Sequence, residues 1–403
     1  MPRRVVVSGI GVLCAVGRNR EEFTCSLRQG RCGVSRIDNV ERYDLRFENG
    51  AEVKNFEPTD YLDPKQADMM DRFAQFALIA AREAVAQSGI EWTPELRDTT
   101  AIVTGSCVGG KSTENQGFWD VYKVGRNRVH PMTIPKTMAN AGASCISLEF
   151  GITGPAFTIS TACASSAHAI GQAFTMVRSG MCDVAITGGS EATFSHGILK
   201  AWEAMRVVSP TVCRPFSRDR NGMILGEGAA MLVIETLEHA LARGARPLAE
   251  IVGFGMSSDA HHVTQPCAEG AAKAMALALR DAALAPEQIG YVNAHGTGTS
   301  VNDCTETHAL HLAFGDHARK LAVSSTKAMH GHTLGAAGAI EMAATILGAT
   351  NGFLPPTIHF NEPDPDCDLD YIPNHARGAD IEFALSNSFA FGGLNAVLAL
   401  RFL

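Results

Sequence analysis

The chain has 403 residues, a net charge of −8 and no long run of basic residues, so nucleic acid is excluded as an expected partner. Hydrophobic residues make up 46% of the chain and charged residues 19%, which excludes disorder, and the length favours two domains or one duplicated unit. No apolar run reaches the roughly 18–20 residues of a membrane span, and the N-terminus lacks the pattern of a signal peptide. The eleven cysteines include no C-x-x-C pair, which is typical of reduced thiols. We therefore expect a cytoplasmic α/β enzyme.

Ten short apolar runs, separated by helical patterns, predict ten strands. Their near-continuous apolar character is typical of a sheet that is buried on both faces. In the first half of the chain the predicted strands are 5–9, 100–104, 156–160, 183–187 and 230–235. In the second half they are 250–254, 291–294, 321–324, 381–386 and 396–402. The predicted helices include 65–87, 166–180 and 271–284, and the proline-rich stretch 355–373 is predicted to be an ordered surface loop.

A strand–turn–helix unit occurs once in each half of the chain. Strand 156–160 runs into a turn of small residues and then a helix, and strand 321–324 does the same. A repeated unit with five strands in each half predicts an internal duplication. The predicted boundary, where Gly244 interrupts the pattern, divides the chain into residues 1–246 and 247–403.

Cys163 lies at a predicted strand-to-helix turn, with alanine and serine around it. A thiol at such a turn protrudes, and the N-terminus of the following helix favours its thiolate form. Cys163 is therefore the candidate nucleophile for covalent catalysis. The alternative is a buried inert thiol, which is what we expect of the other cysteines.

Two histidines follow predicted strand ends among small residues, His295 in Asn-Ala-His-Gly-Thr-Gly-Thr and His332 in His-Gly-His-Thr. Neutral imidazoles can donate hydrogen bonds to a developing oxyanion, beside a thiolate that carries an acyl group. The alternative is a zinc site at His295, His330 and His332, but the chain has neither an H-E-x-x-H motif nor paired cysteines. We therefore favour a Cys–His–His catalytic site without a metal.

The sequence contains no nucleotide-binding loop. Gly9-Ile10-Gly11 belongs to the first strand and its turn, but Cys14 stands where the G-x-G-x-x-G motif needs a glycine, and no P-loop is present. We therefore expect no cofactor.

Five separated motifs together resemble the β-ketoacyl-[acyl carrier protein] synthases, which are elongating condensing enzymes of the thiolase superfamily. These motifs are the turn at Cys163, residues 214–228, residues 293–299, the K-x-x-x-G-H of 327–332 and Asn-Ser-Phe-Ala-Phe-Gly-Gly at 387–393. The Cys–His–His set resembles synthases I and II, whereas the priming synthases carry asparagine where His332 stands. The resemblance implies a thiolase-like α-β-α-β-α layered duplication, in which two five-stranded sheets enclose helices and the site lies where the halves meet.

The resemblance also implies a role for each candidate residue. Cys163 takes an acyl chain from acyl carrier protein as a thioester, and His295 and His332 assist decarboxylation of a malonyl carrier. The backbone N–H groups of Cys163 and Phe391 would bind the oxyanion, and Lys327 would order the site together with Glu341, Asp303 and Glu306. Phe391, Gly392 and Gly393 would form a gate. Val108 and Thr133 would line the acyl pocket, and Lys65 and Arg72 would dock the carrier. The alternatives are a structural ion pair for Lys327 and core packing for Phe391 and Val108.

The implied partners are acyl- and malonyl-loaded acyl carrier protein and a second copy of the chain, with a heterodimer with a chain-length partner as the alternative. Asp68 and Met69 interrupt the basic cluster that housekeeping synthases use for docking, and residues 302–307 and 364–370 look closer to nodulation-type and polyene-type enzymes. A dedicated specialised pathway is therefore the alternative to fatty acid synthesis. Remoter alternatives are a thiolase, which needs a second catalytic cysteine that the chain lacks after Cys367, and a non-catalytic chain-length partner.

Overall fold

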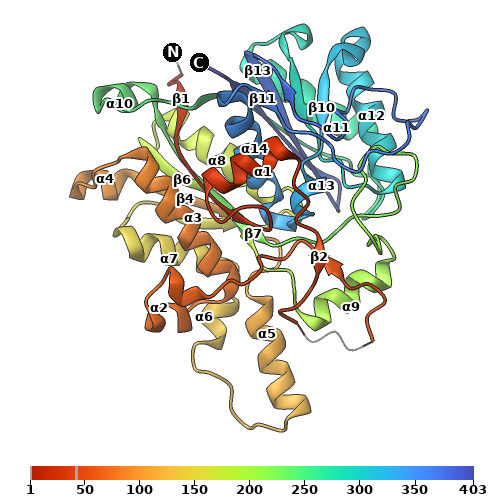
Figure 1. Cartoon of the computed structure of the whole chain (residues 1–403). Helices are drawn as coiled ribbons and strands as arrows, with labels where there is room; N and C mark the ends of the chain where they lie inside the picture. Colours follow the sequence, from red (N-terminus) through yellow and green to blue (C-terminus); the bar gives the residue numbers. More distant parts are fainter. Residues whose placement is uncertain (1, 41–43) are drawn as a thin grey trace.

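The computed structural model describes residues 2–40 and 44–403, and ten of its strands form one large mixed sheet (Figure 1). The order across the sheet is β10-β9-β13-β14-β8-β1-β7-β6-β4-β5. The strands of the first half are β1 (Val5–Cys14), β4 (Thr100–Gly105), β5 (Ala156–Ile159), β6 (Val184–Glu191) and β7 (Gly228–Thr236). Those of the second half are β8 (Ala249–Ser258), β9 (Tyr291–Asn293), β10 (Ala322–Ser324), β13 (Phe383–Ala390) and β14 (Leu394–Arg401). The short pairs β2 (Ser35–Arg36) with β3 (Asn49–Gly50) and β11 (Phe353–Leu354) with β12 (Arg377–Gly378) lie apart from this sheet.

The strand order confirms the predicted duplication. When the strands of each half are numbered along the chain, both β5-β4-β6-β7-β1 and β10-β9-β13-β14-β8 read 3-2-4-5-1. All ten predicted strands are present, with ends that differ by a few residues. The division at residues 246 and 247, between α10 (Leu237–Ala242) and β8, stays a prediction.

The expectation of two separate sheets needs a correction. The first residues of β1 pair antiparallel with β8 over three residue pairs, Val5↔Ile251, Val6↔Glu250 and Val7↔Ala249. Each of these strands would otherwise end its half of the sheet with unpaired N–H and C=O groups, and pairing satisfies them. The duplicated halves are therefore joined into one continuous sheet at this edge.

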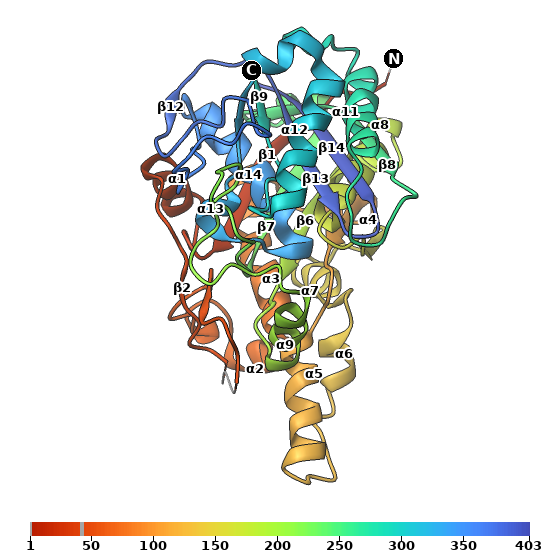
Figure 2. The same ribbon diagram turned by 90° about the vertical axis from the view of Figure 1, so that its right-hand side faces the viewer.

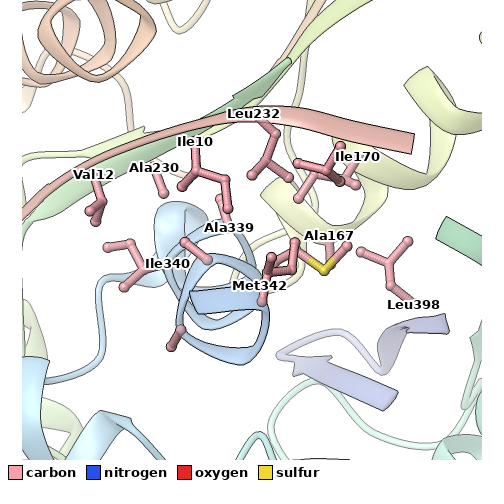
Figure 3. Close-up of a cluster of buried hydrophobic side chains, with 14 of the residues drawn as sticks. Ile10, Val12, Ala167, Ile170, Ala230, Leu232, Ala339, Ile340, Met342 and Leu398 are labelled. Atoms are coloured by element: carbon pink, nitrogen blue, oxygen red, sulfur yellow. The ribbon is translucent and has the colours of Figure 1, made fainter. Parts of the chain in front are cut away.

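Two central helices, α8 (Ser165–Ser179) and α14 (Ala337–Thr350), lie between the halves of the sheet. Their apolar residues share one core with side chains of β1, β7 and β14. Figure 3 shows Ile340 of α14 on the side of Val12 of β1 and Met342 of α14 on the side of Leu398 of β14. The layered arrangement of the thiolase-like fold is thus present, with α8 and α14 as its middle layer.

The outer helices cover the remaining faces of the sheet. In the first half α3 (Arg72–Ser88) and α7 (Ala141–Phe150) pack on β1, β4, β6 and β7. In the second half α11 (Ala268–Ala282) and α12 (Ser300–Phe314) share a core with β9, β13 and β14. The other helices are α1 (Arg20–Gln29), α2 (Pro64–Asp68), α4 (Pro94–Thr99), α5 (Lys111–Phe118), α6 (Thr133–Thr137), α9 (His196–Met205) and α13 (Lys327–His330).

Two local features differ from the sequence patterns. The helix predicted over 65–87 is divided into α2 and α3, because Asp71 accepts a hydrogen bond from the Phe73 N–H (3.2 Å) and so caps a new helix. Gly11, expected in the turn after the first strand, lies inside the longer β1, where a Cβ would come within 1.9 Å of the Ala80 carbonyl oxygen of α3. The glycine therefore serves close packing of a helix on the sheet.

An arm made of α5 and the residues after it projects from the body of the molecule (Figures 1 and 2). It exposes large apolar side chains, among them Phe118, Tyr122 and Ile134. In the part of the chain that the structure describes, every helix is too short or too polar to cross a membrane.

Candidate active site

Cys163 lies at a tight turn between β5 and α8. The preceding residue, Ala162, has a φ of +48°, a conformation that a residue with a Cβ rarely adopts. Ser165 holds this turn, since its hydroxyl accepts the Thr161 N–H (2.9 Å) and donates to the Ala162 carbonyl oxygen (2.6 Å). The strained turn places the thiol, which is 6% exposed, on the wall of a cavity.

The surroundings of the thiol act on its charge in opposite directions. Burial raises the pKa of Cys163 to about 11, while the Lys327 ammonium and the backbone N–H groups of Phe391 and Cys163 favour the thiolate. These two N–H groups are therefore placed to stabilise negative charge next to the sulfur. Donors fixed in this way form an oxyanion hole.

The two histidines share the same cavity with Cys163. His295 follows β9 and His332 follows α13, and their rings stand edge to face with centroids 5.4 Å apart. Burial and the nearby Lys327 ammonium lower the pKa of both imidazoles well below 6.5. Both rings are therefore neutral, and each carries one N–H donor.

Lys327 is fully buried in an ion pair with Glu341 of α14. Its Nζ also lies 3.3 Å from Nδ1 of His295. Because an ammonium can only donate hydrogen bonds, Nδ1 of the neutral His295 is an acceptor and its proton is on Nε2. The sequence left a structural ion pair and a part in the site as alternatives for Lys327, and in the structure its ammonium contacts both Glu341 and His295.

Two buried carboxylates of α12 hold the loop that carries His295. Glu306 accepts the backbone N–H groups of His295 (2.8 Å) and Gly296 (2.7 Å). Asp303 accepts those of Gly298 (3.2 Å) and Phe216 (2.8 Å). Burial raises the pKa of Glu306 to about 7. Both residues fix backbone around the site, and Glu306 holds the backbone of His295 itself.

Phe391 lies in the turn between β13 and β14, followed by Gly392 and Gly393 with φ values of +86° and +70°. Its ring stacks on Trp202 of α9 at 6.1 Å between centroids and 27° between planes. Both aromatic rings line the cavity. The sequence analysis missed Trp202, because a tryptophan in an amphipathic helix carries no signal that distinguishes a cavity wall from a core.

The cavity has a volume of about 340 Å³ and is walled mostly by apolar and aromatic side chains. The predicted residues that line it are Cys163, His295, His332, Phe391 and Gly393. Val108 and Thr133 are absent from its described walls. The structure thus brings one thiol, two neutral imidazoles and two backbone donors to one apolar space.

Comparisons with known proteins agree with this arrangement. The model of the β-ketoacyl synthase N-terminal domain matches residues 2–240, and that of the C-terminal domain matches residues 248–361. The chain belongs to the β-ketoacyl synthase family. It is therefore a ketosynthase-type condensing enzyme of the acyltransferase class.

Individual relatives match this synthase over its full length. Nodulation protein E of Rhizobium sp. (strain N33) is 45% identical to it over 403 residues, which cover 100% of both chains. The 3-oxoacyl-[acyl-carrier-protein] synthase 2 of Staphylococcus aureus (strain COL) is 40% identical, over 99% of this chain and 98% of the relative. The solved structure of the ishigamide ketosynthase/chain length factor matches with a TM-score of 0.95 at 37% identity and covers 100% of both chains.

The two cations expected to dock a carrier have different surroundings in the synthase. Lys65 of α2 is exposed. Arg72 is only half-buried, but its guanidinium makes two hydrogen bonds to the buried Glu227 (2.6 and 2.9 Å) and lies over the rings of Phe56 and Phe76. Arg72 is therefore committed to contacts within the chain, and Lys65 alone of the pair presents an exposed charge.

The predicted acyl-pocket residues lie outside the cavity. Val108 is half-buried and its N–H donates to Glu191 (3.2 Å), while Thr133 begins α6 near the projecting arm. Val108 follows Cys107, which packs in the same apolar cluster as Cys163. Val108 is thus one residue removed from the nucleophile's surroundings.

The zinc alternative has no support in the geometry. Both ring nitrogens of His330 are occupied, Nδ1 by the Gly331 carbonyl oxygen (2.9 Å) and Nε2 by the Thr326 hydroxyl (3.0 Å). Within residues 2–40 and 44–403 the one group with metal-ligand spacing is Cys304, Asp364 and Cys367. There the guanidinium of Arg220 already contacts the Cys304 sulfur (2.8 Å) and the Asp364 carboxylate.

Proposed function

We propose that this synthase joins a malonyl thioester to an acyl chain held on Cys163, with loss of CO₂, to give a 3-oxoacyl thioester on acyl carrier protein. The observation that carries the proposal is the cavity that Cys163 shares with the neutral rings of His295 and His332. A thiol alone would support many acyl transfers. Two neutral N–H donors beside it suit an enolate.

In the first half-reaction the thiol of Cys163 gives up its proton, and the sulfur attacks the carbonyl carbon of the acyl carrier thioester. The carbonyl oxygen becomes an oxyanion, which the backbone N–H groups of Cys163 and Phe391 stabilise. The bond from carbon to the carrier sulfur then breaks, and the carrier thiol leaves with a proton. The acyl chain remains on Cys163 as a thioester.

In the second half-reaction the bond between the malonyl carboxylate and its α-carbon breaks, so that CO₂ leaves and the electron pair enters an enolate. His295 donates from Nε2, together with the N–H of His332, to the enolate oxygen. The α-carbon then attacks the acyl carbonyl on Cys163. A carbon–carbon bond forms, the carbon–sulfur bond breaks and the Cys163 thiolate takes up a proton, so the enzyme is restored.

The proposed partners are acyl carrier protein in its acyl- and malonyl-loaded forms and a second copy of the chain. The name of the Staphylococcus aureus relative includes acyl carrier protein as part of the compound that the relative synthesises. The strand β5 ends the sheet with exposed Ala156 and Phe157, and such an edge is a template for pairing with another chain. The likeness to the ishigamide ketosynthase/chain length factor supports a heterodimer as the alternative. Eleven cysteines without a disulfide support a cytoplasmic location.

A dedicated specialised pathway is the second candidate. Nodulation protein E is 45% identical to the chain, against 40% for the synthase 2 of Staphylococcus aureus. Of the two cations only Lys65 is exposed, because Arg72 is paired with Glu227. This arrangement fits a carrier that does not need a dense basic patch. The thiolase alternative is disfavoured because no cysteine follows Cys367, and the non-catalytic alternative because Cys163 is present.

The test is an assay of the purified synthase with malonyl carrier protein and acyl carrier protein. We expect a 3-oxoacyl carrier product and release of one CO₂ for each product. Parallel reactions with two acetyl coenzyme A molecules test the thiolase alternative, and carriers from fatty acid synthesis and from a specialised pathway separate the two candidate pathways. Absence of the 3-oxoacyl product with every carrier would contradict the proposal.

A further inference from the structure

Glu191 is a fully buried carboxylate that the proposed reaction does not use. It is the last residue of β6 and accepts four hydrogen bonds, which satisfy both of its oxygens. Oε1 accepts the Ser106 hydroxyl (3.0 Å) and the Val108 N–H (3.2 Å). Oε2 accepts the N–H groups of Cys107 (2.6 Å) and Gly335 (3.0 Å). A buried carboxylate with this many donors fixes the backbone around it.

These hydrogen bonds connect the two halves of the molecule at the active site. Cys107 belongs to the loop after β4 in the first half, and it packs in the same cluster as Cys163. Gly335 belongs to the second half and lies three residues after His332. A Cβ at Gly335 would come within 2.4 Å of the Cys107 nitrogen and 2.5 Å of Glu191 Oε2. The contact is therefore too close for any other residue.

The turn that Glu191 holds is strained. Leu334, between His332 and Gly335, has a φ of +46°, although it carries a branched side chain. A conformation of this kind persists only where the surroundings hold it. The hydrogen bond from the Gly335 N–H to Glu191 is one such restraint, immediately after the strained residue.

The ring of His332 has fewer direct restraints than the ring of His295. The ring of His295 contacts Lys327 through Nδ1, and Glu306 holds its backbone. In contrast, Nδ1 of His332 is buried without a hydrogen-bond partner among the described residues. The backbone of His332 is held by residues 224–226, because its N–H donates to the Ile224 carbonyl oxygen (2.6 Å) and its carbonyl oxygen accepts the Gly226 N–H (3.0 Å), and Glu191 holds the turn that follows. The place of its ring is therefore set by the backbone on either side.

We propose that Glu191 is a positioning residue for His332, because its carboxylate clamps the turn after His332 to the loop beside Cys163. The inference rests on the proposed role of His332 in decarboxylation. It assigns Glu191 no contact with substrate. Its consequence is selective, since loss of the clamp displaces the turn after His332, whereas Ser165 holds the turn at Cys163. Burial and the Glu191 charge both raise the pKa of the Cys163 thiol, so loss of that charge favours the thiolate and does not impair acylation.

The test is Glu191→Gln, in which the amide nitrogen cannot accept the two hydrogen bonds that one carboxylate oxygen accepts. Misplacement of a catalytic group by about 1 Å can cost about 10²-fold in rate. We therefore expect the kcat of malonyl carrier decarboxylation to fall by about that factor with little change in KM, whereas acylation of Cys163 by an acyl carrier changes less than threefold. Alkylation of Cys163 measures the fraction of folded active sites in each preparation, and both rates are divided by that fraction.

Two further variants separate positioning from plain stability. Glu235→Gln is the matched control, because Glu235 is also a fully buried glutamate at a strand, bonded to Arg243 (3.0 Å) away from the cavity. It should lower the melting temperature and leave the ratio of the two partial reactions unchanged. If Glu191→Gln does not fold, Gly335→Ala takes its place, since the added Cβ displaces the same turn and should cause the same selective loss.

Equal loss of both partial reactions, or a lower melting temperature with both rates unchanged, would overturn the inference for Glu191. His332→Ala is measured in parallel. If that variant decarboxylates at the rate of the unmodified synthase, the proposed role of His332 fails instead. The two failures are therefore distinguishable.

Discussion

The ammonium of Lys327 lies 3.3 Å from Nδ1 of His295, and Glu341 pairs with the same ammonium from α14. All three side chains are buried. This row of groups fixes the proton of His295 on Nε2, because the ammonium occupies the other nitrogen as a donor. Burial and the same ammonium also lower the pKa of the ring. The ion pair thus determines which atom of His295 can donate in the cavity.

Replacement of Lys327 by methionine separates the two contributions of this ion pair. Lys327→Met leaves the Glu341 carboxyl buried without its partner, and breaking a buried pair in this way costs about 3–5 kcal/mol. Lys327→Met combined with Glu341→Gln removes both charges and should recover most of the free energy of unfolding, measured in urea. Decarboxylation should stay low in both variants, because His295 loses its fixed tautomer. A double variant that decarboxylates normally would show that the pair is only structural.

His295→Ala and His332→Ala should each impair decarboxylation more than acylation. Each removes one N–H donor to the enolate, and loss of such a donor costs about 10²–10³-fold in rate. The measurement compares CO₂ release from malonyl carrier with transfer of the acyl group to Cys163 in the same preparation. Normal CO₂ release by either variant would disprove the assignment of that histidine.

The rings of His295 and His332 in the acyl-loaded synthase should stay neutral between about pH 8 and about pH 5.5. An ordinary imidazole with a pKa of 6.5 becomes protonated in this interval, but burial and the Lys327 ammonium lower the pKa of His295 and His332 well below that value. The rate of decarboxylation is not a clean measure of this, because burial raises the pKa of Glu306, which holds the backbone of His295, to about 7. The NMR chemical shifts of the two rings measure their protonation directly. A midpoint near 6.5 in the shifts of either ring would contradict the prediction.

Val108 lies outside the described cavity, so the prediction for it holds for a long acyl chain that extends past the cavity wall toward Cys107: Val108→Phe should then shorten the longest chain that the synthase accepts. Val108 is half-buried beside Cys107, whose side chain packs in the cluster of the nucleophile. Each methylene in an apolar pocket discriminates by about 1–3 kcal/mol. Competition between short and long acyl carriers, read as product lengths, measures the change. An unchanged length profile in a folded variant would remove Val108 from the acyl pocket.

Much of the fold and of the site could be predicted from local sequence patterns. The ten strands follow from apolar runs, and Cys163, His295 and His332 follow from small-residue turns after strands. The pairing of Val5 with Ile251 could not be predicted in this way, because it joins two strands far apart in the chain whose edges look alike in sequence.

The contributions of Trp202 and Glu191 also depend on tertiary structure. The ring of Trp202 on α9 contacts Phe391 only after the turn between β13 and β14 is placed beside it. Glu191 ends an apolar strand, where a carboxylate would be expected to face solvent. Its four donors come from two loops that the sequence separates by more than a hundred residues. For the same reason, the commitment of Arg72 to Glu227 was not foreseen.

The most direct measurement is peptide mass spectrometry of the synthase after incubation with an acyl carrier protein, followed by addition of malonyl carrier protein. The account predicts that the acyl mass is found on the peptide with Cys163, and that it disappears as an equal amount of 3-oxoacyl carrier forms. In Cys163→Ala the acyl mass and the product should both be absent. An acyl group on another residue, or a 3-oxoacyl product from Cys163→Ala, would contradict the central claim.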